Sequence, residues 1–108
     1  MKRGDLVTIS LQGDFGKPRP ALVIQADQFM SHSSVTVLPL TSTIVDAPLL
    51  RFTIRPSKEN SLKKASQVMI DKTMTIQRNK LGAPFGHVDP KAIIEIEQRL
   101  ALFFGIAH

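Results

Sequence analysis

Two short apolar runs that carry prolines constrain the fold of this chain most strongly. The first covers residues 21–25 directly after Pro20, and the second covers residues 35–40 and contains Pro39. Runs of this length, rich in valine, leucine and isoleucine, are typical of buried central strands, and we expect the prolines to set their ends. With 108 residues, the chain is long enough for one compact domain, 1–108, and too short for two.

Further strands are predicted on both sides of these runs. Residues 6–11 and 51–55 alternate apolar and polar side chains, as a strand with one buried face does. Residues 67–70 form another short apolar run that passes into residues 71–76, whereas residues 26–34 and 57–64 have the composition of connecting loops. Five or more short strands indicate a mainly β fold, and most simply a small antiparallel barrel.

The hydrophobic period changes near the C-terminus, which predicts one helix. Asp89 is a favourable N-cap, and Pro90 suits the first helical turn. Apolar residues then recur at helical spacing at Ile93, Ile96, Leu100 and Phe104. We therefore expect a mainly β fold with a C-terminal helix that caps the barrel.

The charge of the chain favours an anionic partner. Its formal net charge is +5 and its pI is about 10.0, and a basic surface attracts nucleic acid or an acidic protein. The chain contains no cysteine, which excludes disulfides and thiolate metal sites. It has neither a signal-peptide core nor an apolar run long enough to span a membrane, so we expect a cytoplasmic protein without a membrane partner.

Arg19 and a group of hydroxyl residues are the candidates for chemistry. Arg19 lies between Pro18 and Pro20, which restrict the backbone on both sides, and its planar guanidinium suits phosphate oxygens. Thr41 and Ser42 follow a predicted strand and could donate hydrogen bonds to a phosphate. Taken singly, such an arginine is more often an exposed residue beside a turn, and such hydroxyls more often cap a turn.

Metal and cofactor signatures are missing from the sequence. The three histidines, His32, His87 and His108, lie far apart and form no pair with metal-ligand spacing. Nucleotide-binding glycine motifs and the Gly-x-Ser-x-Gly motif are also absent. We expect neither a metal nor a cofactor.

Three segments taken together resemble the MazF/PemK family of toxin endoribonucleases. They are Gly4-Asp5-Leu6-Val7, Arg19-Pro20-Ala21-Leu22-Val23 and Leu38-Pro39-Leu40-Thr41-Ser42, in this order and spacing. The resemblance implies an SH3-like barrel of the CcdB/PemK type. It also implies a homodimer that cuts single-stranded RNA at short sequences without a metal, inhibits translation and growth, and is neutralised by a cognate antitoxin protein.

The resemblance also assigns roles to residues. Arg19 and Thr41 match the catalytic arginine and hydroxyl residue of the family, Ser42 lies beside the latter, and Asp71 matches an aspartate that some members place near the RNA. In the mechanism implied, the RNA 2′-hydroxyl attacks its adjacent phosphorus, while Arg19 stabilises the developing charge and Thr41 orients the phosphate.

Other side chains could add contacts to RNA. Single-stranded RNA stacks its bases on aromatic rings, and Phe15, Phe52 and Phe85 are the candidates for such platforms. Lys17 and Lys72 could bind phosphates. Each of these five residues is also consistent with an ordinary core, turn or solvated position.

The C-terminus supports a competing interpretation. Phe104, Gly105 and Ile106 resemble the end of the CcdB toxin, which poisons DNA gyrase and has no nuclease activity, although its tryptophan is replaced by Phe104. The same segment is also consistent with aromatic rings that close the barrel and a glycine that ends the helix. The Arg19 and Thr41 segments favour the nuclease interpretation. Under the CcdB-like alternative, the partner would be DNA gyrase.

Overall fold

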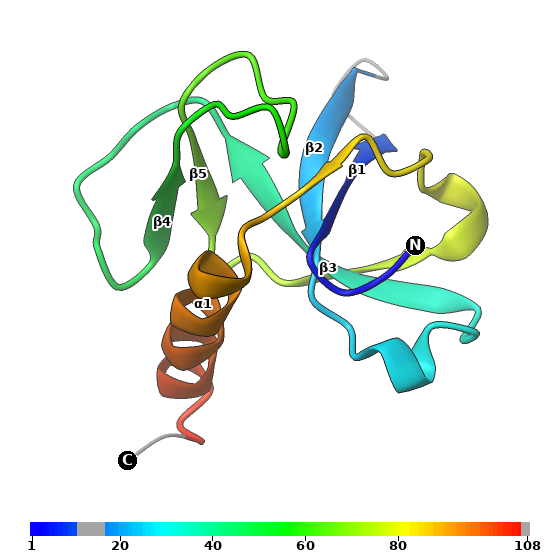
Figure 1. The fold of residues 1–108 in the computed structure, drawn as a ribbon. Coiled ribbons are helices and arrows are strands. Elements are labelled where there is room, and N and C mark those ends of the chain that lie inside the picture. The colour runs from blue at the N-terminus through cyan, green and yellow to red at the C-terminus, as the bar shows by residue number, and fades with distance from the viewer. Residues whose placement is uncertain (11–16, 107–108) are drawn as a thin grey trace.

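The computed structural model describes residues 1–10 and 17–106, which form a curled antiparallel sheet and one C-terminal α-helix (Figure 1). The predicted mainly β fold with a C-terminal helix is therefore confirmed. The strands are β1 (Asp5–Ser10), β2 (Pro18–Val23), β3 (Ser34–Thr41), β4 (Arg51–Ile54), β5 (Ser66–Met69), β6 (Met74–Gln77) and β7 (Gly86–His87). The helix α1 covers Pro90–Phe103, and 3₁₀ turns cover Asp27–Phe29 and Arg78–Lys80.

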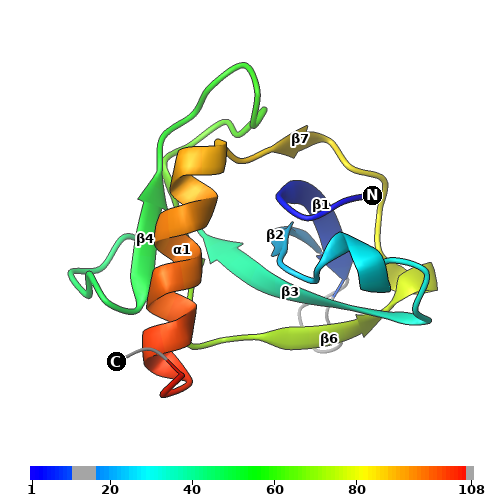
Figure 2. The same cartoon turned by 60° about the horizontal axis from the view of Figure 1, so that its bottom comes forward.

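The strand β3 is the centre of the sheet. The strand order is β4-β5-β3-β2-β1-β7, and β6 also pairs with β3. One edge of β3 pairs with β2, whereas its other edge pairs with β6 along residues 34–37 and then with β5 along residues 40–41. Figure 2 shows β6 running beside the first half of β3. The sheet therefore curls around β3 into a half-barrel.

The prolines lie inside strands, so the prediction that they end strands is wrong. Pro20 pairs with Thr8 of β1, and Pro39 pairs with Ala21 of β2. The amide of Ile24 donates to the carbonyl of Thr36, so even-numbered residues of β2 turn their backbone groups toward β3. Pro20 faces β3 without an N–H to donate, and the β2–β3 pairing accordingly stops at Ala21.

Both faces of the central strands are buried, which explains the short apolar runs of β2 and β3. On one face, buried residues from β1, β2, β3 and β5 pack against Ile96 and Leu100 of α1. On the other face, valines and alanine of the same central strands form a second cluster with Ile9. We call these the helix-side core and the opposite core. The helix-side core contains Leu6, Leu22, Leu38, Leu40, Ile54, Val68, Ile70, Val88, Ile96 and Leu100.

The C-terminal helix begins where the sequence predicts. The Asp89 carboxylate accepts a 2.8 Å hydrogen bond from the Lys91 amide, which caps the first turn. Gly105 adopts a φ of +72°, in the left-handed region that ends helices. None of the helices in the described residues has the length and apolar character to span a bilayer.

The end of this helix differs from the expectation. Phe103 and Phe104 are 47% and 53% exposed, so the prediction that aromatic rings close the barrel is wrong. Phe104 occupies the C-cap of α1, and Figure 1 shows that the last turn of the helix extends past the ends of β4 and β5. The sheet therefore offers no surface for these rings to cover.

Candidate active site

Arg19 and Thr41 occupy the same end and the same face of the sheet. The register pairs Ala21 with Pro39, and two further residues along each strand lead to Arg19 and Thr41. Side chains alternate between the faces of a strand, so Arg19 shares a face with Ala21, and Thr41 shares a face with Pro39. This is the face of the opposite core, turned away from α1.

The two strand ends diverge, which leaves both side chains accessible. Beyond Pro39, the strand β3 leaves β2 and pairs with β5 instead, and Figure 1 shows the start of β2 and the end of β3 pointing apart. Arg19 is exposed and Thr41 is half-buried. A long guanidinium side chain on one strand end and a hydroxyl on the other can therefore contact one phosphate from two sides.

The hydroxyl of Thr41 already has a fixed acceptor role. Its oxygen accepts a 3.1 Å hydrogen bond from the amide of Thr43. Because a hydroxyl can accept and donate at once, the Thr41 proton remains able to donate to a phosphate oxygen. Ser42 is exposed directly after Thr41, and Lys17 is exposed directly before β2. Both therefore lie at the same end of the sheet as the candidate pair.

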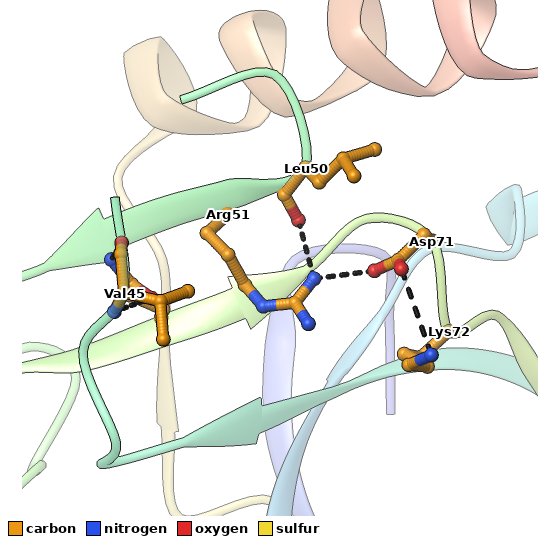
Figure 3. Close-up of polar contacts among 6 residues, drawn as sticks. Val45, Leu50, Arg51, Asp71 and Lys72 are labelled. Carbon is orange, nitrogen blue, oxygen red and sulfur yellow. Dashed lines mark hydrogen bonds and ion pairs between the residues drawn. The ribbon is translucent and has the colours of Figure 1, made fainter. Parts of the chain in front are cut away.

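Asp71 and Lys72 lie elsewhere. They follow β5, four residues beyond Gln67, which is the β5 residue paired with Thr41. The Asp71 carboxylate accepts a 2.5 Å hydrogen bond from the Arg51 guanidinium and has the Lys72 ammonium 3.6 Å away (Figure 3). The Arg51 and Asp71 side chains are only 17% and 19% exposed. The structure therefore does not bring Asp71 and Lys72 together with Arg19 and Thr41 in one chain.

The charges around Asp71 keep it ionised. Partial burial raises the pKa of its carboxyl, but the Arg51 hydrogen bond, a backbone hydrogen bond and the positive charges of Arg51 and Lys72 outweigh this and hold the pKa below 3.8. A carboxylate with a lowered pKa is a poor general acid at neutral pH. The arrangement is that of a stabilising ion pair.

Phe52 packs toward the helix, and its predicted role as a base-stacking platform stays a prediction. Phe52 pairs with Val68, which pairs with Leu40, and this row belongs to the helix-side core. The Arg99 guanidinium lies 5.0 Å from the centre of the Phe52 ring. Phe52 therefore lies on the opposite face of the sheet from Thr41, with one side of its ring occupied.

Of the other aromatic candidates, Phe85 is partly buried against the helix-side core, and Phe15 lies outside the described residues. Their stacking roles stay predictions. Among the histidines in the described residues, His32 lies within hydrogen-bonding distance of Ser34, and His87 lies in β7. Across residues 1–10 and 17–106, no three side chains of the kinds that bind metal come together.

Comparison with known proteins identifies the family. The family model described as PemK-like, MazF-like toxin of type II toxin-antitoxin system matches residues 2–104. The chain belongs to this toxin family. A curated relative from Mycolicibacterium smegmatis, named probable endoribonuclease MazF, is 42% identical over 108 residues, which cover 99% of each chain.

Solved structures of PemK/MazF toxins share the fold. A mycobacterial endoribonuclease in complex with its cognate antitoxin superposes with a TM-score of 0.83 at 23% identity, covering 100% of this chain and 98% of the other. MazF from Deinococcus radiodurans gives a TM-score of 0.77 at 19% identity, covering 97% and 96%. Identity at this level supports the fold alone.

The CcdB-like interpretation of residues 104–106 of this PemK/MazF toxin gains no support. Phe104 and Ile106 are 53% and 71% exposed, and the Phe103 and Phe104 rings form an edge-on pair 5.5 Å apart. Exposure would permit a protein contact, but neither the family match nor these relatives support a gyrase poison. The family match favours the nuclease interpretation.

Proposed function

We propose that this PemK/MazF toxin is a metal-independent endoribonuclease that cuts single-stranded RNA at short sequences and thereby inhibits translation and growth. The observation that carries the proposal is the placement of Arg19 and Thr41 on one face and at one end of the sheet. The name of the 42% identical relative, probable endoribonuclease MazF, supports it.

The proposed chemistry is transfer of a phosphodiester within the RNA. The 2′-oxygen forms a bond to the adjacent phosphorus, and the bond from phosphorus to the 5′-oxygen breaks, giving a 2′,3′-cyclic phosphate and a free 5′-hydroxyl. Arg19 stabilises the negative charge that grows on the non-bridging oxygens, and the Thr41 hydroxyl donates to the same phosphate. Arginine stays protonated at neutral pH, so Arg19 supplies charge and is not the acid that protonates the leaving oxygen.

Neighbouring side chains extend the proposed site along the RNA backbone. Lys17 and Ser42 lie next to the catalytic pair in sequence and are exposed, so each can bind a flanking phosphate. Asp71 and Lys72 receive a different role from the one their sequence position implies. Because Arg51 engages Asp71, we assign this group to stability.

Two protein partners fit the surface. Structures of relatives contain a cognate antitoxin, and the net charge of +5 suits an antitoxin with an acidic segment. The helix end and the loop before β4 expose large apolar side chains, a composition that suits a homodimer contact. These side chains are Leu49, Leu102, Phe103, Phe104 and Ile106. We propose that this toxin acts as a homodimer in the cytoplasm.

Incubation of the purified protein with a long RNA in EDTA tests the proposal. Wild-type protein should cut at defined sites, leaving 5′-hydroxyl ends, and Arg19→Ala should abolish cutting while its circular dichroism stays unchanged. Arg55→Ala, which removes the same charge from an exposed position after β4, is the matched control and should cut normally. Intact RNA together with inhibited gyrase supercoiling would contradict the proposal and favour the CcdB-like alternative.

A further inference from the structure

Gln67 is a buried polar residue in the middle of the sheet, and it stands directly beside Thr41. The register of β3 and β5 pairs the two residues, and only 3% of Gln67 is exposed. A buried amide costs free energy unless each of its polar groups finds a partner. The partners of this side chain therefore indicate why an amide occupies the position.

Every hydrogen-bonding group of the Gln67 amide is used. Its Oε1 accepts from the Val45 amide at 3.1 Å, and its Nε2 donates to the Val45 carbonyl at 3.0 Å. The second Nε2 hydrogen is directed to Thr53 Oγ1 at 3.1 Å. The side chain thus binds both backbone groups of Val45, as a neighbouring strand would. It fastens the loop of residues 42–50 to the sheet.

Burial of apolar side chains does not hold this loop. Ile44, Val45 and Leu49 are 52%, 45% and 60% exposed. The loop is instead fixed by polar contacts: the Thr43 amide binds Thr41 Oγ1, the Gln67 side chain binds Val45, and Arg99 Nε donates to the Pro48 carbonyl at 2.9 Å. Gln67 provides the central one of these contacts.

We propose that Gln67 is a positioning residue that acts through Thr41. Gln67 holds Val45 through two hydrogen bonds, a contact that we call the latch. The latch fixes residues 42–44 and keeps the Thr43 amide hydrogen-bonded to Thr41 Oγ1. That hydrogen bond restricts the Thr41 hydroxyl to orientations in which its proton points away from the loop. The proposal rests on the endoribonuclease function proposed above, and it adds the residue that orients the catalytic hydroxyl.

Gln67→Leu tests the latch, because leucine preserves an apolar side chain of similar length while removing all three hydrogen bonds. The variant should lower kcat for cleavage of a defined oligoribonucleotide by about ten- to a hundredfold, the range expected for a misplaced catalytic group, with little change in KM. Hydrogen exchange should become faster at Val45 and across residues 42–50. Thr53→Val, which leaves both Val45 contacts intact, is the control and should retain the wild-type kcat.

A double-mutant comparison separates positioning from general stability. In a Thr41→Ala background, Gln67→Leu should cause no further loss of kcat, because the group it positions is gone. A Gln67→Leu variant that is folded and has wild-type kcat, or one whose loss of kcat persists in the Thr41→Ala background, would overturn the proposal. Wild-type protein that leaves RNA uncut would overturn the endoribonuclease function itself, and exchange at Val45 would then still report whether the latch exists.

Discussion

Two arginines at strand ends of this molecule have opposite surroundings. Arg51, at the start of β4, is 17% exposed and is neutralised by Asp71. Arg19, near the start of β2, is exposed, and the end of β3 on the same face of the sheet carries the hydroxyl of Thr41. An arginine enclosed with a carboxylate contributes to stability, whereas an exposed arginine opposite a hydroxyl suits an incoming phosphate. The contrast separates a mostly buried charge from an exposed one that we propose to be catalytic.

The two surroundings follow from how each strand is paired. β4 pairs with β5 along its whole length, which carries Arg51 into the neighbourhood of the turn that holds Asp71. β2 loses its β3 partner at Pro20, so the strand ends separate there. A proline inside a strand thus shapes the candidate site, because it ends the pairing of β2 with β3 next to that site.

Arg19→Ala should produce the largest effect on activity. Loss of a preorganised charge at a developing oxyanion lowers kcat by about a hundred- to a thousandfold. Thermal unfolding should be unchanged, because the side chain is exposed. Single-turnover cleavage of an oligoribonucleotide gives the rate, and calorimetry gives the melting temperature. A variant that loses stability but cuts RNA at the normal rate would reverse the contrast between the two arginines.

Thr41→Val should produce the next largest effect. A hydrogen bond to a charged group contributes about 1.5–3 kcal/mol, which corresponds to a loss of about ten- to a hundredfold in rate. Thr41→Ser retains the hydroxyl and should remain within a few-fold of wild type. The same single-turnover assay measures both variants. Equal rates for the valine and serine variants would show that the hydroxyl takes no part in the reaction.

Asp71→Ala should affect stability without affecting cleavage. Removing the acceptor leaves the Arg51 guanidinium, itself mostly buried, without its carboxylate, at a cost of about 1–3 kcal/mol in the free energy of unfolding. Urea denaturation measures this loss, and Asp46→Ala at an exposed position is the control. A normal unfolding midpoint with lost cleavage would place Asp71 in the active site after all.

The stability contributed by Asp71 should depend on pH in one direction. Its folded-state pKa lies below the ordinary value of 3.8, so its contribution is fully present above pH 3.8 and is lost as the pH falls through the lowered pKa. The difference in melting temperature between wild type and Asp71→Ala should be constant near neutral pH and should shrink in strong acid. A difference that grows on acidification would contradict the ion-pair assignment.

Phe52→Leu should produce the smallest effect. The ring gains about 0.5–1 kcal/mol from the Arg99 guanidinium, and leucine keeps most of its packing in the helix-side core. RNA affinity, measured by fluorescence anisotropy with a cleavage-deficient Arg19→Ala background, should not change. A stacking platform would instead lose about 1–3 kcal/mol per base, and a drop of that size would restore Phe52 to the binding site.

Local patterns predict most of the fold. The alternating and apolar runs locate β1 to β6, and Asp89 and Pro90 locate the start of α1. The two-residue strand β7 is too short to show alternation. Asn60, in a segment expected to be a solvated loop, is 4% exposed because its side chain accepts from the amides of Ser57 and Leu62. A side chain that bonds to several amides of one turn depends on the final geometry of that turn, which composition does not specify.

The candidate site is only partly predictable for the same reason. The order of the Arg19 and Thr41 segments indicates the pair, but their common face follows from the register of β2 and β3. The link between Arg51 and Asp71 joins residues that are distant in sequence, so only the folded chain reveals it. Gln67 was missed because a single amide in an apolar strand carries no motif.

The central claim is that Arg19 and Thr41 act on one phosphate, and a double-mutant cycle of single-turnover cleavage rates tests it most directly. The cycle compares wild type, Arg19→Ala, Thr41→Val and the double variant on one oligoribonucleotide. Two groups that stabilise the same transition-state charge should be strongly coupled, so the double variant should be hardly slower than Arg19→Ala alone. Losses that multiply in full would show that the two residues act independently, which would contradict this account.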